Sequence, residues 1–286
     1  MQKNPQNLKN PLLWNDRMNS STNLFDLKNK TVILTGSAGR LGSRFAQVLS
    51  SVGANVVLVD IDDQKNSKLE KSLIKKFGTK PMLSNTDISN QNQVRKMVKN
   101  VVKKYRKIDV LINNAHFLPR EDPKIDTPFE KYPLDLWEEC VKKNMVGLFL
   151  CCQEVGKVMK KQSNGVILNV SSIYGIQGSD QRIYGNSKLN TPSFYALTKG
   201  GMVNFTRYLA AYWNRKGVRV NTLTLGGVRD DKLQNKSFIQ KYSEKTMIGR
   251  MANKEDYDGA LLFLCSDASS YMTGSNLVID GGWSAW

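Results

Sequence analysis

Short runs of β-branched and other apolar residues alternate along the chain with longer segments whose apolar positions recur every three or four residues. A run of four to eight such residues is typical of a buried strand, and the wider spacing is typical of an amphipathic helix. Strands that alternate with helices indicate βαβ units, in which helices cover both faces of a parallel sheet. The pattern predicts seven strands, at residues 31–35, 55–60, 81–87, 109–115, 165–172, 219–225 and 276–280.

Segments of helical periodicity occupy the intervals between the predicted strands. In the first interval, one face of a helix collects Leu41, Phe45, Val48, Leu49 and Val52. The other helices are expected at about residues 64–77, 91–105, 134–161, 195–215 and 254–266. The predicted fold class is therefore α/β, a doubly wound Rossmann-type domain with a seven-stranded parallel sheet.

A single domain over residues 24–286 accounts for this regular order. The chain has 286 residues, of which 40% are hydrophobic, and this is enough for one large core. Neither an internal repeat nor a linker interrupts the alternation. The preceding extension, residues 1–23, is polar and contains Pro5 and Pro11, so we expect it to be loosely held or to pack on a neighbouring subunit.

Composition argues against several classes of protein. No apolar run reaches the roughly 18 residues of a membrane helix, and no signal-peptide apolar region is present, so we expect a cytoplasmic protein without a membrane partner. The four cysteines have no CxxC spacing and fall in apolar helical segments, which predicts buried reduced thiols. A single histidine, His116, excludes HExxH zinc sites and Ser-His-Asp hydrolysis, and we expect no metal.

The formal charge of +17 has three interpretations: a lysine-rich solvated surface, attraction of an anionic small substrate, or nucleic-acid binding. The lysines are scattered, without a block of five or six and without basic residues interleaved with exposed aromatics. This pattern favours the solvated surface, leaves an anionic substrate open and disfavours nucleic acid.

A glycine-rich turn, TGSAGRLG at residues 35–42, connects the first predicted strand to the first helix. Such a turn lets the backbone approach a pyrophosphate, while the start of the helix offers unpaired N–H groups and the positive end of its dipole. Its place in a βαβ unit predicts dinucleotide binding. The expected contacts are Gly36, Ser37, Gly39, Arg40, Leu41 and Gly42.

Asp60 ends the second predicted strand, 24 residues beyond Gly36. A carboxylate there can accept hydrogen bonds from the adenosine ribose and would repel a 2′-phosphate, which favours NAD over NADP. Asp60 could instead cap the following helix, a role that Asp62 could equally fill. The guanidinium of Arg40 could tolerate the phosphate, so NADP is not excluded.

Several further motifs occur in a fixed order over residues 26–283: Asp87 after the third strand, NNA at 113–115, Asn144 in a helix, NVSS at 169–172, a YxxxK helix, RVN at 219–221 and DGG at 280–282. Together with the glycine turn, this set resembles the short-chain dehydrogenase/reductase family. The resemblance implies reversible hydride transfer between a secondary alcohol and a nicotinamide cofactor. It extends the expected cofactor contacts to Ile61, Asp87, Ile88, Asn114, Ala115, Tyr195, Lys199, Gly226 and Val228.

Three positions depart from the usual pattern of that family. Arg40 stands where TGxxxGxG has its middle glycine, and His116 replaces the glycine of NNAG. Leu225 and Gly226 stand where the family has proline and glycine after the sixth strand. None of these changes removes a proton-transfer group.

The YxxxK spacing occurs twice, as Tyr184 with Lys188 and as Tyr195 with Lys199. Residues four apart share a face only on a helix, and Pro192 prevents a helix from running on through the first pair. The second pair is followed by an apolar stripe of helical period, and Ser193 is placed to cap that helix. Tyr195 and Lys199 are therefore the expected catalytic pair.

A tyrosine that exchanges a proton near neutral pH must have its pKa lowered by about 3, which corresponds to roughly 4 kcal/mol. One ammonium about 4 Å away supplies about that much at an effective dielectric near 20, so Lys199 alone could suffice. Ser172 could hydrogen-bond the reacting oxygen, with Ser171 as the alternative and the resemblance favouring Ser172. By resemblance, Asn144 holds a helix kink and a water that relays protons towards Lys199.

Three variable segments, after NNA, before Tyr195 and after the sixth strand, should determine the substrate. They contain Arg120, Arg182 and Arg229 among many polar residues, which indicates a small polar and potentially anionic substrate. The candidate substrate contacts are His116, Tyr174, Arg182 and Tyr184.

A second, weaker resemblance suggests a sugar, a sugar acid or a nucleotide-linked sugar as substrate. The loop before YALTKGG and the segment NFTRYLAAYW resemble a branch associated with bacterial surface-sugar and flagellin modification. The alternatives are a polyol or 3-oxoacyl-thioester reductase and a non-catalytic dinucleotide-binding regulator.

The family resemblance also implies a homodimer or homotetramer built on helices 134–161 and 195–215. The final WSAW could close a neighbour's site or pack locally.

Overall fold

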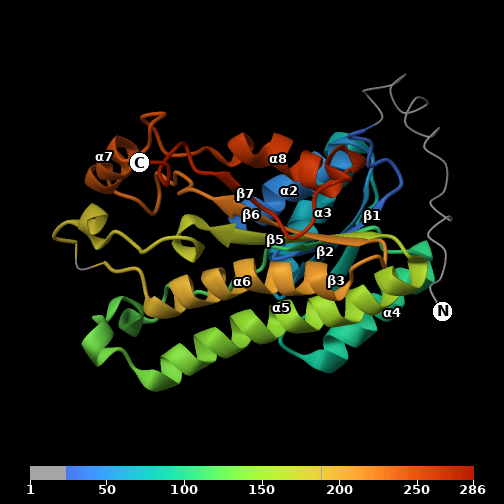
Figure 1. The fold of residues 1–286 in the computed structure, drawn as a ribbon, viewed down its shortest axis with the longest axis horizontal. Coiled ribbons are helices and arrows are strands. Elements are labelled where there is room, and N and C mark those ends of the chain that lie inside the picture. The colour runs from blue at the N-terminus through green and yellow to red at the C-terminus, as the bar shows by residue number, and fades with distance from the viewer. Residues whose placement is uncertain (1–23, 188) are drawn as a thin grey trace, which may run out of the picture.

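Alternate residues of the central strands point to opposite sides of the sheet, and both sides are buried. The computed structural model describes residues 24–187 and 189–286. It contains one seven-stranded, all-parallel sheet in the order β3-β2-β1-β4-β5-β6-β7 (Figure 1). The predicted fold is confirmed. The strands are β1 (Thr31–Thr35), β2 (Asn55–Asp60), β3 (Met82–Asn85), β4 (Val110–Asn113), β5 (Gly165–Ser172), β6 (Val218–Leu225) and β7 (Asn276–Ile279).

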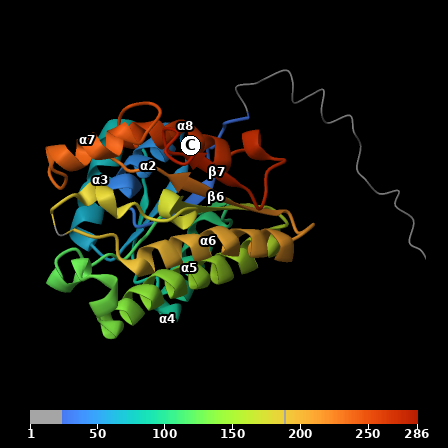
Figure 2. The ribbon, with the colours of Figure 1, turned by 60° about the vertical axis from the view of Figure 1, so that its left-hand side comes forward.

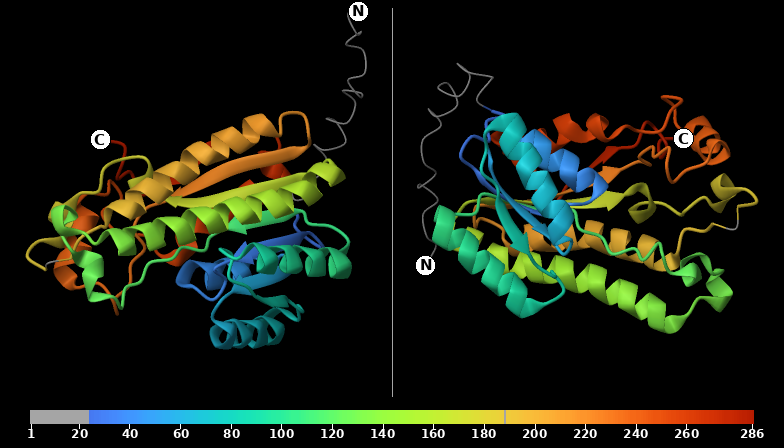
Figure 3. Two further views of the ribbon diagram at one scale, coloured as in Figure 1. Left: turned by 90° about the horizontal axis from the view of Figure 1, so that it is seen from below. Right: turned by 180° about the vertical axis from the view of Figure 1, so that it is seen from behind.

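Helices cover both faces of this sheet, as expected for a parallel sheet buried on both sides (Figures 2 and 3). Helices α2, α3 and α8 pack together on one face, and α4, α5 and α6 pack together on the other. The long helices α5 and α6 lie side by side along the sheet, as the left view of Figure 3 shows. The helices are α2 (Arg40–Ser51), α3 (Asp63–Phe77), α4 (Gln91–Tyr105), α5 (Leu134–Gln162), α6 (Ser193–Tyr212), α7 (Lys236–Glu244) and α8 (Asp258–Cys265).

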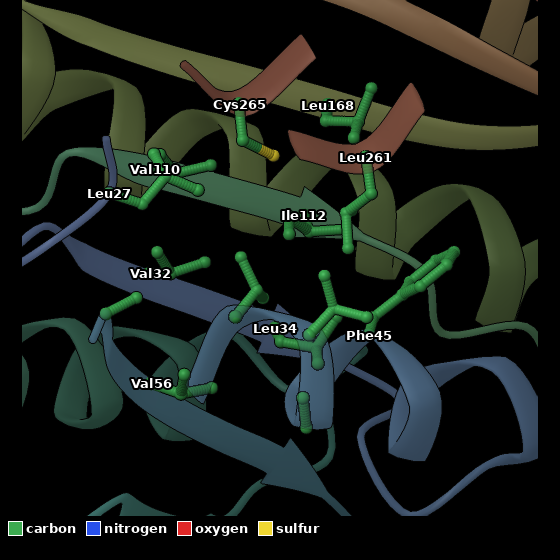
Figure 4. Packing of buried hydrophobic residues seen from close by; sticks show 14 of the residues in the cluster. Leu27, Val32, Leu34, Phe45, Val56, Val110, Ile112, Leu168, Leu261 and Cys265 are labelled. Carbon is green, nitrogen blue, oxygen red and sulfur yellow. The ribbon is translucent and has the colours of Figure 1, made fainter. Parts of the chain in front are cut away.

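The alternation of side chains along β1 divides the core into two layers. Val32 and Leu34 pack with Phe45 of α2 and Leu261 of α8 (Figure 4). Ile33 instead faces the layer under α4, α5 and α6. All five of these side chains are buried. Each fully buried aliphatic or aromatic side chain contributes roughly 1.5–3 kcal/mol, so this double core fixes the strand ends that carry the site.

Three local expectations differ from the structure. The predicted helix at 254–266 is a 3-10 turn, Lys254–Tyr257, followed by the shorter α8. Ser193 does not cap α6: the capping position is Pro192, and the hydroxyl of Ser193 is buried without a partner. Helix α7 was not predicted at all, although Asn235 caps it by accepting from Phe238 N at 2.8 Å.

Two expectations concern the ends of the chain. The predicted extension, residues 1–23, lies outside the described residues. The C-terminal WSAW packs locally: the ring of Trp283 lies 4.2 Å from that of Tyr242, and Trp286 Nε1 donates to Lys245 O at 3.2 Å. Within residues 24–187 and 189–286, no helix has both the length and the apolar character that spanning a membrane requires.

Candidate active site

A cleft of about 1000 Å³ opens at the carboxyl ends of the strands. Ligands bind at this edge of open α/β sheets, next to the place where the strand order reverses. Here the reversal lies between β1 and β4, because the chain runs outward from β1 to β3 and then returns to β4 on the other side. The glycine turn and the YxxxK helix face each other across this cleft.

The glycine turn packs too closely to accept side chains at two positions. Gly36 has a φ of +66°, and a Cβ there would lie 2.7 Å from Ala115 Cα. A Cβ on Gly42 would lie 2.0 Å from the carbonyl oxygen of Gly36. Helix α2 then begins without a side-chain cap and without an acidic residue in its first turn. This bare, positively polarised helix start fits the pyrophosphate of a dinucleotide.

Two residues of the turn differ from the expected cofactor contacts. Ser37 is buried below the turn, where its hydroxyl donates to Asn66 Oδ1 at 2.8 Å, so its side chain does not line the cleft. Arg40 lines the cleft but is turned toward the loop after β6. Its Nη1 lies 3.2 Å from both the Val228 carbonyl oxygen and a carboxylate oxygen of Asp230.

Asp60 lies at the cleft end of β2 and Asp62 caps the next helix. Asp62 Oδ1 accepts from Lys65 N at 2.9 Å, which leaves Asp60 free of the capping role. Asp60 Oδ2 accepts from Ala38 N at 2.9 Å and Oδ1 accepts from Asp62 N at 3.0 Å. Each carboxylate oxygen has a further lone pair, so Asp60 can still accept hydrogen bonds from a ribose.

The remaining expected cofactor residues also line the cleft. Asn114 closes the base of the turn, because its Nδ2 donates to Thr35 O at 3.0 Å and to Gly36 O at 3.1 Å. The carboxylate of Asp87 accepts from Ser89 in the loop after β3. The cleft lining includes Gly36, Gly39, Arg40, Leu41, Gly42, Asp60, Ile61, Asp87, Ile88, Asn114, Ala115, Tyr195, Lys199, Gly226 and Val228.

Tyr195 and Lys199 lie in the first two turns of α6, which begins directly after Pro192. The ammonium of Lys199 donates to Val170 O at 2.9 Å and lies 5.9 Å from the centroid of the Tyr195 ring. Both side chains line the cleft. Lys188 lies outside the described residues, whereas Tyr184 ends a separate 3-10 turn, Gln181–Tyr184.

Burial dominates the acid–base properties of this pair. It lowers the pKa of Lys199 to about 8. It also raises the pKa of Tyr195, a rise that the hydrogen bond with Ser172 and the charge of Arg120 only partly oppose. The expectation that Lys199 alone brings Tyr195 near neutrality is therefore wrong for the protein by itself. The desolvation of a buried phenolate outweighs one ammonium nearby, so additional positive charge is needed.

The two serines that end β5 have different surroundings. Ser171 Oγ is buried and donates to Lys199 O at 2.9 Å, which ties β5 to α6. Ser172 Oγ accepts from Tyr174 N at 3.3 Å, and its hydrogen bond with Tyr195 lowers the pKa of that tyrosine against the larger effect of burial. Ser172 therefore interacts with Tyr195, whereas the hydroxyl of Ser171 is engaged by α6.

Asn144 of α5 binds the backbone that follows the NNA motif. Its Oδ1 accepts from Phe117 N and its Nδ2 donates to Phe117 O, both at 2.8 Å. The same Nδ2 donates to Cys140 O one turn earlier, also at 2.8 Å. These contacts hold the segment that presents His116 to the cleft.

Three of the four candidate substrate contacts lie in the cleft. The ring of His116 meets Tyr195 edge-on, with centroids 4.9 Å apart, and its Nε2 is buried without a partner. Tyr174 also has a buried, unpartnered hydroxyl, whereas Tyr184 OH lies 2.9 Å from Thr191 Oγ1. Arg182 is not brought to the cleft: its side chain is 85% exposed and pairs with Asp180 at 2.8 Å.

Two asparagines of the motifs hold the strands beneath the site. Asn113 Nδ2 donates to Asn169 Oδ1, and Asn169 Nδ2 donates to Thr206 Oγ1 of α6, each at 2.8 Å. All three side chains are buried. Buried polar groups that satisfy one another in this way fix strand and helix in one arrangement.

Residues of α7 form a wall of the cleft that sequence analysis missed. Phe238 and Tyr242 line the cleft, and α7 packs against the 3-10 turn that holds Tyr184, at one end of the molecule (Figure 1). The available signal was Asn235 followed by apolar residues at positions 238, 239 and 242, a short capped helix. Other lining residues that were not predicted from the sequence include Ala38, Asp62, Lys65, Ser89, Phe117, Leu118, Asn190, Thr191, Leu233, Gln234 and Met251.

The cysteines lie apart from this chemistry. Cys140, Cys151, Cys152 and Cys265 are buried with free thiols, as expected. Burial raises the pKa of the Cys151 thiol to about 12, which keeps it protonated. Within residues 24–187 and 189–286, no group of three or more histidine, cysteine or acidic side chains is arranged to hold a metal ion.

Comparison with known proteins agrees with the geometry. A family profile described as enoyl-(acyl carrier protein) reductase matches residues 36–284. Post-translational flagellin modification protein A of Campylobacter coli is 30% identical over 257 residues, which cover 90% of this chain and 99% of that protein. A short-chain dehydrogenase from Leptospira borgpetersenii with bound NAD+ has a TM-score of 0.77 and 34% identity, covering 91% of this chain and 94% of the other. A gluconate 5-dehydrogenase from Burkholderia cenocepacia, in complex with NADP and tartrate, has a TM-score of 0.81 and 26% identity, covering 92% of this chain and 98% of the other.

Proposed function

The chain belongs to the short-chain dehydrogenase/reductase family and is an NAD(P)-dependent oxidoreductase, and we propose that it interconverts a secondary alcohol and a ketone on a small polar substrate. One observation carries the proposal. Tyr195, Lys199 and Ser172 converge at the end of β5, in the same cleft as the bare start of α2. The bound nicotinamide cofactor supplies the hydride acceptor or donor and, when oxidised, a positive charge.

Tyr195 gives the substrate oxygen its proton in reduction and takes it in oxidation. Ser172 donates a hydrogen bond to the same oxygen and stabilises the charge that develops there. Lys199 is held to Val170 O and supplies positive charge beside the phenol. Asn144 acts through the backbone of Phe117, so we assign it a positioning role.

The coenzyme preferred by this arrangement is NAD. Asp60 is free to bind ribose hydroxyls and repels a 2′-phosphate, and Arg40 is engaged by Asp230 and Val228 O instead of facing the ribose. This pairing removes the main reason to expect NADP.

A sugar, sugar acid or nucleotide-linked sugar is the substrate class that we favour. The substrate end of the cleft offers the imidazole of His116 and the hydroxyls of Tyr174, Tyr184 and Thr191, which suit a substrate rich in hydroxyl groups. Support also comes from the relative named for flagellin modification and the neighbour described with tartrate. A polyol or a 3-oxoacyl thioester on the same scaffold is the alternative substrate.

A non-catalytic regulator is the competing function, and two measurements separate it from an enzyme. Fluorescence titration with NADH tests cofactor binding, and a turnover screen of sugars, sugar acids, nucleotide sugars and polyols with NAD+ and NADP+ tests catalysis. Binding together with turnover supports the proposed reaction. Binding without turnover on any member of the screen favours the regulator, and absence of NADH binding rejects both.

We further propose a homodimer or homotetramer in which α5 and α6 meet a neighbouring subunit. An apolar hollow on these helices is lined by Met145, Val146, Leu148, Phe149 and Phe205. Tyr208 and Tyr212, on the same helix as Phe205, are 59% and 65% exposed. Apolar surface of this kind is typical of a contact between proteins.

We place the protein in the cytoplasm, with which its free thiols agree.

A further inference from the structure

Arg120 lies at the substrate end of the cleft, on the segment that follows His116. Within residues 24–187 and 189–286, no carboxylate approaches its guanidinium within 4.0 Å. By contrast, the two other arginines of the variable segments are paired, Arg182 with Asp180 and Arg229 with Asp231, both at 2.8 Å. Arg120 is therefore an uncommitted fixed positive charge facing the substrate space.

The two acidic residues next to Arg120 in the chain, Glu121 and Asp122, do not line the cleft. Three of the four acidic residues that line the cleft, Asp60, Asp62 and Asp87, lie at the cofactor end, and among the described residues only Asp126 lies at the substrate end. Asp126 Oδ1 accepts from Asn190 N at 3.1 Å, so this carboxylate is engaged in holding the loop. The lining of this end contains three basic residues, Arg120, Lys143 and Lys199, against Asp126 and so keeps a net positive charge.

The positive charge of Arg120 extends to the reacting groups. Burial raises the pKa of Tyr195 and of Tyr184, and Arg120 is among the groups that oppose the rise at both tyrosines. Burial and the charges of Lys199 and Arg120 hold the pKa of His116 well below its usual value. His116 is therefore a neutral imidazole, which can bind a hydroxyl group but adds no positive charge for an anion.

We infer that the substrate carries an oxyanion, either a carboxylate or a phosphate, at the end of the substrate that lies away from its reacting carbon. Arg120 binds this oxyanion, while His116 Nε2 and the Tyr174 hydroxyl bind neutral hydroxyl groups of the substrate. A guanidinium matches either oxyanion with two parallel hydrogen bonds. The buried, unpartnered atoms of His116 and Tyr174 would otherwise remain unsatisfied. This inference rests on the proposed function and narrows its substrate class to anionic polyhydroxy compounds.

Binding to the enzyme–NADH complex tests the inference without requiring turnover. Calorimetric titrations at 150 mM salt would compare D-glucitol with D-gluconate and with D-glucitol 6-phosphate, which differ from it by one carboxylate or one phosphate. We expect at least one anionic probe to bind at least tenfold more tightly than D-glucitol. The better of the two anions identifies the source of the oxyanion.

Variants locate this preference at Arg120. Arg120→Gln should abolish the tenfold preference and leave NADH binding unchanged within threefold. Arg229→Gln removes the same charge from a paired arginine outside the cleft and should keep the preference, which controls for the overall charge of +17. His116→Ala should lower the binding affinity for the neutral probe and for the anionic probes by similar factors.

Equal affinities of wild-type protein for neutral and anionic probes, undetectable binding of all three included, would overturn the inference. Retention of the preference in Arg120→Gln would do the same. Neither result affects NADH binding or turnover in the wider screen, on which the proposed function depends. Loss of the function and loss of the anion site therefore give different results.

Discussion

The hydroxyl of Ser171 donates to the carbonyl oxygen of Lys199 over 2.9 Å, and the adjacent Ser172 hydroxyl faces the cleft. Ser172→Ala should lower kcat by roughly 100- to 1000-fold, the usual loss for one donor to a developing oxyanion. It also removes the 3.3 Å hydrogen bond from Tyr174 N, so it should lower stability slightly, by less than Ser171→Ala does. Ser171→Ala should instead act mainly on stability and lower the free energy of unfolding by about 1 kcal/mol, because it removes a buried hydrogen bond between β5 and α6. Steady-state kinetics and urea unfolding of both variants check this division, and the reverse pattern would contradict it.

Tyr195→Phe should reduce turnover by roughly 100- to 10,000-fold, because it removes the only hydroxyl of the YxxxK helix placed to exchange the substrate proton. Tyr184→Phe is the matched control. It loses one hydrogen bond to Thr191 and should keep turnover within about tenfold, since such a bond is worth about 1 kcal/mol. Comparable losses in the two variants, measured on the best substrate of the screen, would reject the assignment of Tyr195.

Lys199 should make stability depend on pH in a predictable direction. Burial lowers its pKa from 10.5 to about 8, so below about pH 8 the charge is present in both folded and unfolded chains and the burial penalty is complete. As the pH rises from 8 to 10.5, the folded protein loses the proton first and its stability increases. The lowered pKa corresponds to about 3 kcal/mol.

Urea unfolding of wild type and Lys199→Met at several pH values measures this effect. The stability of wild type relative to the variant should rise by about 3 kcal/mol between pH 7.5 and 10.5. Lys96→Met, which removes an exposed lysine of α4, is the control. A flat or falling difference curve for Lys199→Met would show that the amine is not buried as the structure places it.

Coenzyme choice should depend on Asp60 and not on Arg40. Asp60→Asn keeps the shape of the side chain but weakens its hydrogen bonds to a ribose and removes the repulsion of a 2′-phosphate. Affinity for NADH should therefore fall roughly tenfold while affinity for NADPH rises. Arg40→Gln should change both affinities together, because Asp230 and Val228 O engage the guanidinium. Fluorescence titration measures both ratios, and a selective loss of NADPH binding in Arg40→Gln would contradict this account.

Phe149→Glu should reduce the mass of the assembly in solution if α5 and α6 form the subunit contact. A carboxylate in the apolar hollow would be desolvated without a partner on association. Ile74→Glu, an exposed apolar position of α3 on the opposite face of the sheet, is the matched control. Light scattering distinguishes the two, and an unchanged mass for Phe149→Glu would place the contact elsewhere.

Local sequence was sufficient wherever neighbours in the chain determine structure. Strands such as TVILT contain no charged residue because both faces are buried, and Pro192 separates the two YxxxK pairs because proline cannot continue a helix. The short helix α7 was harder to recognise, since nine residues give a weak periodic signal beside polar loops. Its cap at Asn235 was the clearest indication.

Local sequence did not determine the direction in which individual side chains point. Arg182 and Arg120 are both arginines of variable loops with an acid two residues away. Asp180 pairs with Arg182, whereas Asp122 accepts from Lys124 N and leaves Arg120 at the cleft. Ser37 belongs to the glycine turn but faces Asn66, 29 residues later. Such choices depend on partners brought close by folding.

The amino-acid sequence by itself determined the α/β order of elements, the glycine turn and the tyrosine–lysine helix, because these follow from periodicity, glycine and proline within a few residues. Only the tertiary structure decided that the Ser171 hydroxyl is bonded to Lys199 O, that Arg40 pairs with Asp230, and that burial raises the pKa of Tyr195. These outcomes arise from desolvation and from contacts between segments far apart in the chain. Their strength depends on the surrounding atoms, which no local pattern specifies.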